Sequence, residues 1–331
     1  MRSAILGVGH YVPTKVVTND DLARTMPTSD EWIQQRTGIK ERRFIERDGI
    51  GASDLAVPAA QMALERAGRK VSDVDMIIFA TLSPDHNFPG SGCFLGEKLG
   101  LPGVPALDVR NQCSGFLYGL SVADAWIRAG AYKNILVVGA EVHSTGVEFT
   151  ERGRDVAVLF GDGAGAALVG ASPSDDRGLM SIHLHADGTG AKDLWLPAPA
   201  SKHIPRLTQE MFERGDHYPK MNGKQVFRWA TEKMPEVSRE ALAAAGIDIS
   251  KIDLFVPHQA NMRINQYVAD KLGLPPEKVV HNIERYGNTT AATIPIGLSE
   301  SVADGRIKEG STVLTAAFGS GYTWGAAVLR W

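Results

Sequence analysis

The chain has 331 residues, of which 44% are hydrophobic and 22% are charged, and its net charge is −3. A compact chain of this length buries roughly three quarters of its extended surface, so it can form one large domain or two medium-sized ones. The near balance of charge argues against a general nucleic-acid-binding protein, and the apolar content excludes a disordered chain.

Two cysteines, Cys93 and Cys113, are too few for a disulfide framework and lack CxxC spacing. We therefore expect a reduced, cytoplasmic setting. The N-terminal segment MRSAILGVGHYVPTK has too short an apolar run for a signal peptide. No run approaches the roughly 18 apolar residues of a membrane span. The composition thus predicts a soluble protein with no membrane partner.

Short apolar runs along the chain predict strands that are buried on both faces, as in sheets covered by helices on each side. They are Ala4–Val8, Met76–Thr81, Ala106–Val109, Ile135–Gly139, Ala164–Val169, Leu254–Val256, Thr312–Ala317 and Ala326–Leu329. Helices are predicted over Leu55–Ala67 and Ser238–Ala245, each followed by a glycine, the residue that most often ends a helix. This alternation of strands and helices indicates an α/β fold.

An internal repeat organises the chain. Its first pair of matching segments is offset by 178 residues, and two further pairs follow in the same order. The pairs are 63–77 with 241–255, 98–102 with 271–275, and 119–130 with 297–310. Because the period is far too long for a solenoid, we expect two copies of one α/β unit, residues 1–175 and 176–331, packed around a pseudo-twofold axis.

The least regular stretch is residues 187–224, which is rich in Gly and Pro and has little periodicity. Loops of this length are usually lids, binding loops or mobile segments. We expect a long surface excursion here.

Cys113 lies where the strand Ala106–Val109 runs through a polar turn into an amphipathic helix, which we expect to begin at about Cys113. The dipole and the unpaired N–H groups of a helix N-terminus lower the pKa of a thiol and favour the nucleophilic thiolate. The alternative is a buried structural cysteine, because free cysteine is among the most buried residue types. Cys93 lies inside a helix-like segment and is expected to be structural.

His258 follows the strand Leu254–Val256 and Pro257, at the carboxyl edge of a sheet, where α/β sites lie. Asn288 lies in a glycine-containing turn before an apolar helix, roughly the place in the second copy that Cys113 holds in the first. A lone His or Asn in a turn is more often a cap or a hydrogen-bonding core residue. The repeat, however, brings both residues toward the shared axis with Cys113, which favours a functional set.

Three glycines near the C-terminus, Gly319, Gly321 and Gly325, could let backbone N–H groups approach an oxyanion or could form a plain hairpin turn. The glycines of residues 161–165 lack the spacing of a phosphate-binding loop. His183 and His185 alternate along a predicted strand, but no third ligand stands at metal spacing, so no metal site is expected.

Six segments together resemble the β-ketoacyl-acyl-carrier-protein synthase III family of the thiolase superfamily, in the same order over nearly the whole chain. They are SDEWIQQRTGIKERR, DVRNQCSGF, FGDGAGAALV, VPHQANMRI, YGNTTAATIP and AFGSGYTWGAAVLR. The resemblance implies a duplicated five-layered αβαβα fold, which agrees with the repeat.

The resemblance also implies a reaction. Cys113 would take the acyl group of an acyl-CoA, and His258 and Asn288 would donate hydrogen bonds to the thioester oxygen of a malonyl-acyl-carrier-protein as CO2 leaves. The backbone N–H groups of Cys113 and Ser320 would form the oxyanion hole. This decarboxylative condensation would initiate fatty acid synthesis and needs no cofactor or metal.

Further roles follow from the same resemblance, and all of them are family expectations. Arg228 and Arg263 would meet the acidic carrier protein, and Phe88 would reach the acyl pocket of the partner subunit in a homodimer. The residues matching CoA-binding positions are Thr28, Trp32, Arg36, Arg152, Gly223, Phe227 and Ala260. The chain departs from the family pattern at Ser320, where a glycine is expected, at Asp270, where a basic residue is expected, and in the length of residues 187–224.

Other protein classes fit less well. A papain-type peptidase also uses Cys, His and Asn in this chain order, but the chain lacks the CGSCW-like context and the disulfide cysteines, and a duplication has no place in that fold. A thiolase-superfamily relative that uses another acyl primer, or an acyltransferase that does not decarboxylate, remains open. Retention of both His258 and Asn288 favours condensation.

Overall fold

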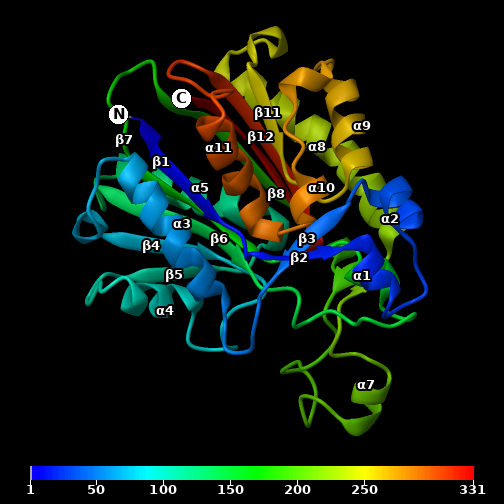
Figure 1. Cartoon of the computed structure of the whole chain (residues 1–331). Coiled ribbons are helices and arrows are strands. Elements are labelled where there is room, and N and C mark those ends of the chain that lie inside the picture. Colours follow the sequence, from blue (N-terminus) through cyan, green and yellow to red (C-terminus); the bar gives the residue numbers. More distant parts are fainter. Residues whose placement is uncertain (1) are drawn as a thin grey trace.

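The computed structural model describes residues 2–331 and is built on two sheets (Figure 1). In the first, the strand order is β1-β7-β6-β4-β5, and in the second it is β11-β12-β13-β8. The strands of the first sheet are β1 (Ser3–Tyr11), β4 (Met76–Ala80), β5 (Ala106–Val109), β6 (Asn134–Glu141) and β7 (Gly163–Ala171). Those of the second are β8 (Gly178–Ala186), β11 (Leu254–Pro257), β12 (Thr312–Gly319) and β13 (Thr323–Arg330). All eight strands predicted from apolar runs are present.

The two sheets repeat each other in direction as well as in order. β4 is parallel to β5 and β6, and β11 is parallel to β12, whereas the pairs β6–β7, β1–β7, β12–β13 and β13–β8 are antiparallel. In the second sheet an isolated parallel bridge between Phe255 and Val279 takes the place of the β4–β5 pair. The predicted duplication is therefore confirmed.

Helices complete five layers. On the outer face of the first sheet lie α3 (Ala52–Arg66) and α4 (Ser91–Lys98), and on that of the second lie α8 (Gly223–Ala245) and α9 (Met262–Leu272). Between the sheets lie α5 (Gly115–Arg128) and α11 (Thr293–Ala303). The predicted helix Ser238–Ala245 is only the end of α8, whose earlier turns also pack Val226, Phe227 and Trp229 against the core of the second sheet.

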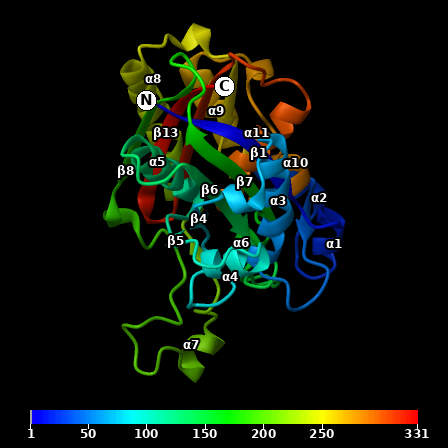
Figure 2. The same cartoon turned by 90° about the vertical axis from the view of Figure 1, so that its left-hand side faces the viewer.

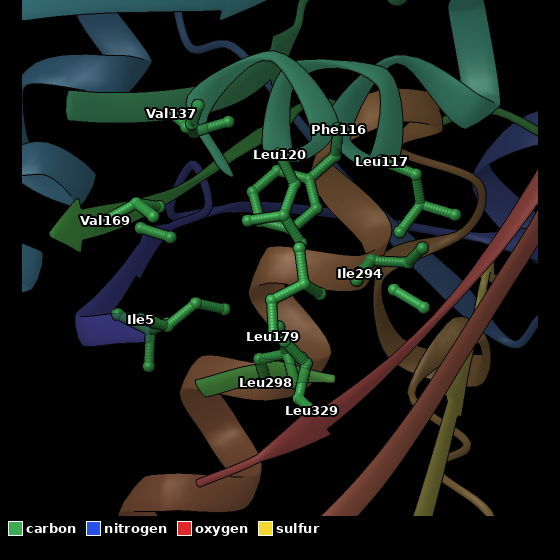
Figure 3. Close-up of a cluster of buried hydrophobic side chains, with 14 of the residues drawn as sticks. Ile5, Phe116, Leu117, Leu120, Val137, Val169, Leu179, Ile294, Leu298 and Leu329 are labelled. Carbon is green, nitrogen blue, oxygen red and sulfur yellow. The ribbon is translucent and has the colours of Figure 1, made fainter. Parts of the chain in front are cut away.

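The central core packs both sheets against both middle helices. Figure 3 shows Phe116, Leu117 and Leu120 of α5 among side chains of the sheets and of α11. The other labelled side chains are Ile5, Val137, Val169, Leu179, Ile294, Leu298 and Leu329. Burying each such side chain contributes roughly 1.5–3 kcal/mol. Contact is also close at the backbone, since a Cβ on Gly139 of β6 would lie 2.2 Å from the Ala291 carbonyl oxygen, just before α11.

Smaller elements connect this framework. They are β2 (Lys15–Thr18), α1 (Asn19–Ala23), α2 (Asp30–Thr37), β3 (Glu41–Phe44), α6 (Arg154–Ala157), β9 (Leu194–Trp195), α7 (Gln209–Glu213), β10 (Lys220–Met221) and α10 (Ile283–Tyr286). Residues 187–224 form the predicted excursion, and the part around α7 projects from the body in both views (Figures 1 and 2). Among residues 2–331, no helix is both long and apolar enough to cross a membrane.

Candidate active site

Cys113 lies at the predicted elbow between β5 and α5, with its side chain buried. A 3₁₀ turn, Gln112–Ser114, precedes α5, so the helix begins two residues later than expected. Gln112 has a φ of 44°, a left-handed conformation that non-glycine residues adopt rarely. Such strain is characteristic of residues that place a functional group.

The second copy repeats this elbow 178 residues later. Thr290 has a φ of 48°, and the turn Thr290–Ala292 leads into α11. Asn288 therefore lies at the matching elbow, as roughly expected, although the residue 178 positions after Cys113 is Ala291. Asn288 lies three residues earlier, where the chain enters the turn.

The predicted lowering of the Cys113 pKa is also wrong. Burial is the main cause that raises the pKa of the thiol to about 12, and the nearby carboxylate of Glu141 adds to it. The backbone N–H groups of Ser320 and of Cys113 itself point at the sulfur and lower the pKa, but by less. Desolvation of the thiolate thus raises the pKa of Cys113 more than the helix N-terminus lowers it. The resting thiol is protonated at neutral pH.

His258 is buried at the end of β11 and is electrically neutral, since burial lowers its pKa to about 3. Its Nδ1 lies 2.7 Å from Oγ1 of Thr293, and that hydroxyl also lies 3.0 Å from the Thr290 carbonyl oxygen. Nε2 has no hydrogen-bond partner among residues 2–331. The Thr293 hydroxyl has one proton, and its direction fixes the tautomer of His258. If this proton points at the Thr290 carbonyl, Nδ1 carries the imidazole proton and Nε2 is an acceptor. If it points at Nδ1, Nε2 carries the imidazole proton and is a donor.

Asn288 is held in one orientation. Its Oδ1 accepts a hydrogen bond of 2.8 Å from the backbone N–H of Thr290, so the amide nitrogen is left as a donor for another partner. The side chain is 5% exposed. Asn288 therefore offers a neutral donor that needs no titration.

One cavity of about 360 Å³ brings these residues together, since Cys113, His258 and Asn288 all line it. Trp32 lies on its wall, with the guanidinium groups of Arg36 and Arg154 at 4.3 and 4.6 Å from the ring centroid. Other expected residues that line it are Gly223, Phe227, Ala260 and Arg263. The sequence interpretation missed Arg154, because only the fold brings it onto Trp32.

Other expected site residues lie outside this cavity. Arg152 pairs with Glu148 at 2.7 Å and donates to the Glu213 carbonyl oxygen. Thr28 has a buried hydroxyl with no partner among residues 2–331. Phe88 and Arg228 are exposed on the surface, and so is Cys93, which was expected to be structural.

A second cavity of about 420 Å³ meets the first at Cys113, Phe160 and Leu194. Ser320 lines this second cavity. The left-handed residues of its loop are Gly321, with a φ of 75°, and Tyr322, with a φ of 46°, so Ser320 fits without a positive φ. The sulfur of Cys113 is thus reached from two sides.

Glu141 ends β6 beneath this site and is fully buried. It accepts hydrogen bonds from the backbone and hydroxyl of Ser83, from Thr81 and from the backbone of Leu82. Burial outweighs these bonds and raises the pKa of Glu141 to about 7.

A raised pKa in the folded state gives stability that is full below the ordinary pKa of 4.5 and is lost as the pH rises through 7. Glu141→Gln removes this titration. We therefore expect the unfolding free energy of wild type, measured relative to that of Glu141→Gln, to fall by about 3 kcal/mol between pH 4.5 and 7.5. Urea unfolding of both proteins across this range measures the difference. A difference that stays constant with pH would contradict the prediction.

Comparison with known proteins agrees with this geometry. The family model of 3-oxoacyl-[acyl-carrier-protein] synthase III matches residues 107–188, and its C-terminal model matches residues 242–331. The chain is 46% identical over 331 residues to the β-ketoacyl-[acyl-carrier-protein] synthase III of Geobacillus kaustophilus, covering 100% of this chain and 99% of that protein. It is 44% identical over 329 residues to that of Xanthomonas campestris, covering 99% and 98%.

Solved structures are similar throughout. The 3-oxoacyl-[acyl-carrier-protein] synthase III of Aquifex aeolicus superposes with a TM-score of 0.90 at 41% identity, covering 99% of this chain and 100% of that chain. The β-ketoacyl synthase III of Thermus thermophilus gives 0.91 at 42% identity, covering 99% of each chain. The five-layered fold expected from the resemblance is confirmed.

Proposed function

This chain belongs to the 3-oxoacyl-[acyl-carrier-protein] synthase III family, and from that premise we propose that it condenses an acyl-CoA primer with malonyl-acyl-carrier-protein to initiate fatty acid synthesis. The observation that carries the proposal is that Cys113, His258 and Asn288, from three separate elements, line one cavity. A thiol nucleophile with two neutral polar partners suits covalent acyl transfer followed by stabilisation of an enolate.

In the first half-reaction, the Cys113 sulfur attacks the thioester carbonyl of acyl-CoA. The carbon–sulfur bond to CoA breaks, and the thiol proton ends on the CoA sulfur. Because burial keeps Cys113 protonated, a base has to relay this proton, and Nε2 of neutral His258 is an acceptor on the same cavity. The N–H groups of Cys113 and Ser320, which point at the sulfur, hold the oxyanion.

In the second half-reaction, malonyl thioester loses CO2, and the electrons of the broken carbon–carbon bond form an enolate. The Asn288 amide donates to the enolate oxygen. His258 donates from Nε2 in its other tautomer, in which Nε2 has taken a proton from solvent, Nδ1 has released one, and the Thr293 hydroxyl donates to Nδ1. The carbanion then attacks the acyl group, the bond to the Cys113 sulfur breaks, and the released thiolate takes up a proton. Each donor at a developing oxyanion contributes roughly 2.7–4 kcal/mol.

The CoA nucleotide would bind at the wall of the first cavity that Trp32 forms. Its ring and the neighbouring guanidinium groups of Arg36 and Arg154 suit an adenine and anionic phosphates. Gly223, Phe227 and Ala260 line the path inward to Cys113. For two expected CoA-binding residues outside the cavity the proposal is retained: Arg152, whose guanidinium pairs with Glu148, and Thr28, which follows the Pro27 carbonyl that accepts a hydrogen bond from Arg154.

The carrier protein and the second subunit would bind to exposed residues of this chain. Arg263, at the cavity mouth, and exposed Arg228 would meet the acidic carrier protein. Exposed Phe88 would enter the acyl site of the partner subunit in a homodimer; its side chain is 82% exposed in one chain. We also propose that the duplicated units divide between residues 175 and 176, in the turn between β7 and β8.

The test is a panel of acyl-CoA primers, from acetyl to decanoyl, mixed with malonyl-acyl-carrier-protein. We expect release of CO2 and CoA together with formation of 3-oxoacyl-carrier-protein for at least one primer. Release of CoA without CO2 would identify an acyltransferase that does not decarboxylate. No acyl transfer from any primer would overturn the proposal.

A further inference from the structure

The first part of the excursion is fastened to the loop that faces the nucleophile. The Asp187 N–H donates to the Tyr322 carbonyl oxygen at 2.8 Å, and the Tyr322 hydroxyl donates to Asp193 at 2.5 Å. The Ser320 hydroxyl donates to the carbonyl oxygen of Leu194. Gly190 lies flat against the Tyr322 ring, where a Cβ would come within 2.0 Å of a ring carbon.

Leu194 lines both cavities together with Cys113 and Phe160, and we call Leu194 the partition between them. The next two residues, Trp195 and Leu196, line the second cavity only. β9 pairs with β10 through Leu194–Met221 and Trp195–Lys220, and this two-stranded sheet has no other strand. Besides this pairing and the hydrogen bonds from Asn222 to Asp193, the fastenings to the 320–322 loop hold the partition in position.

The second cavity is suited to an apolar chain. Its walls near Cys113 are largely aliphatic and aromatic, and its polar residues include Asp85 and Arg110. The apolar walls are formed by Leu82, Val142, Val147, Phe160, Leu194 and Leu196. An acyl group carried on Cys113 would extend along these walls, and the place of Leu194 would limit its length and width.

We propose that the Ser320 hydroxyl determines which primer is accepted: by holding the Leu194 carbonyl it fixes the partition of the acyl cavity, while its own backbone N–H faces the sulfur. This inference rests on the proposed function. Ser320 stands where a glycine is expected, and a glycine would have no hydroxyl to make this bond. The side chain acts through Leu194 and is a positioning group.

The experiment compares wild type with Ser320→Ala and Tyr322→Phe. Each variant removes one fastening and keeps the backbone N–H groups and the cavity-lining Leu194. The readout is the rate of Cys113 acylation by acetyl-, butyryl-, hexanoyl-, octanoyl- and decanoyl-CoA. The control is Thr189→Val, which removes the bond from Thr189 to Asp187 within the same excursion but no fastening to the loop.

We expect both variants to shift the preference toward longer primers, changing the decanoyl-to-acetyl rate ratio about fivefold to tenfold, the size of one net hydrogen bond. The Thr189→Val ratio should equal that of wild type. If Ser320→Ala fails to fold, Ser320→Gly, which also lacks the hydroxyl and keeps the backbone N–H, takes its place. Equal slowing with all primers, or an unchanged ratio, would overturn the inference. A wild type that no acyl-CoA acylates would instead overturn the proposed function.

Discussion

Replacement of Cys113 by alanine should abolish covalent acylation and condensation. No other residue that lines the cavity offers a thiol, since the sulfur of Met221 is a thioether, and the acyl-enzyme divides the reaction into its two halves. The variant should still fold, because the change removes one small buried side chain. Intact-mass measurement after incubation with acyl-CoA should show the added acyl group on wild type and none on Cys113→Ala.

Cys93→Ala provides the matched control. Cys93 is the other cysteine of the chain and is exposed on α4, away from both cavities. We expect it to acylate like wild type. Equal labelling of Cys113→Ala and wild type would show that another residue is the nucleophile and would remove the basis of the mechanism.

Replacement of Asn288 by aspartate should separate the two half-reactions. The new side chain has the same shape and can still accept the Thr290 N–H, but it puts a second oxygen where the amide donor was. The enolate would then meet repulsion in place of a hydrogen bond. We expect decarboxylation to fall about 10²–10³-fold or more, with acylation of Cys113 retained.

The effect of His258→Ala should differ from that of Asn288→Asp, since His258 both accepts the thiol proton and donates to the enolate. Both half-reactions should slow in that variant. Single-turnover acylation followed by CO2 release from malonyl-carrier-protein measures the two steps separately. Loss of acylation in Asn288→Asp, or full acylation in His258→Ala, would contradict these roles.

The sequence was sufficient for the framework of the fold. Apolar runs located the strands, and for β5 the predicted bounds Ala106–Val109 are those observed. Glycines placed the ends of α3 and α8, where Gly68 and Gly246 have φ values of 62° and 66°. Strand positions depend on the burial of whole apolar segments, and helix ends depend on local residues such as glycine. Both can be read from the sequence.

The electrostatics of the site could not be predicted in this way. A helix terminus is visible in the sequence, but the burial of Cys113 and the approach of Glu141 arise only from packing between distant segments. The contact of Arg154 with Trp32 has the same origin. The sequence placed Asn288 in the matching turn only roughly, because similarity between the copies is weak there and the matching conformations of Gln112 and Thr290 are a property of the backbone.

The contact between Gly139 and the carbonyl of Ala291 leaves no room between the first sheet and the turn before α11. The contact thus fixes the spacing between the first sheet and this turn. What differs between the copies is the connection after the first strand of each: residues 12–51 carry Trp32, and residues 187–222 carry Leu194. The residues of both connections that line the cavities, Trp32 and Leu194, can therefore be changed without altering either sheet or the two middle helices.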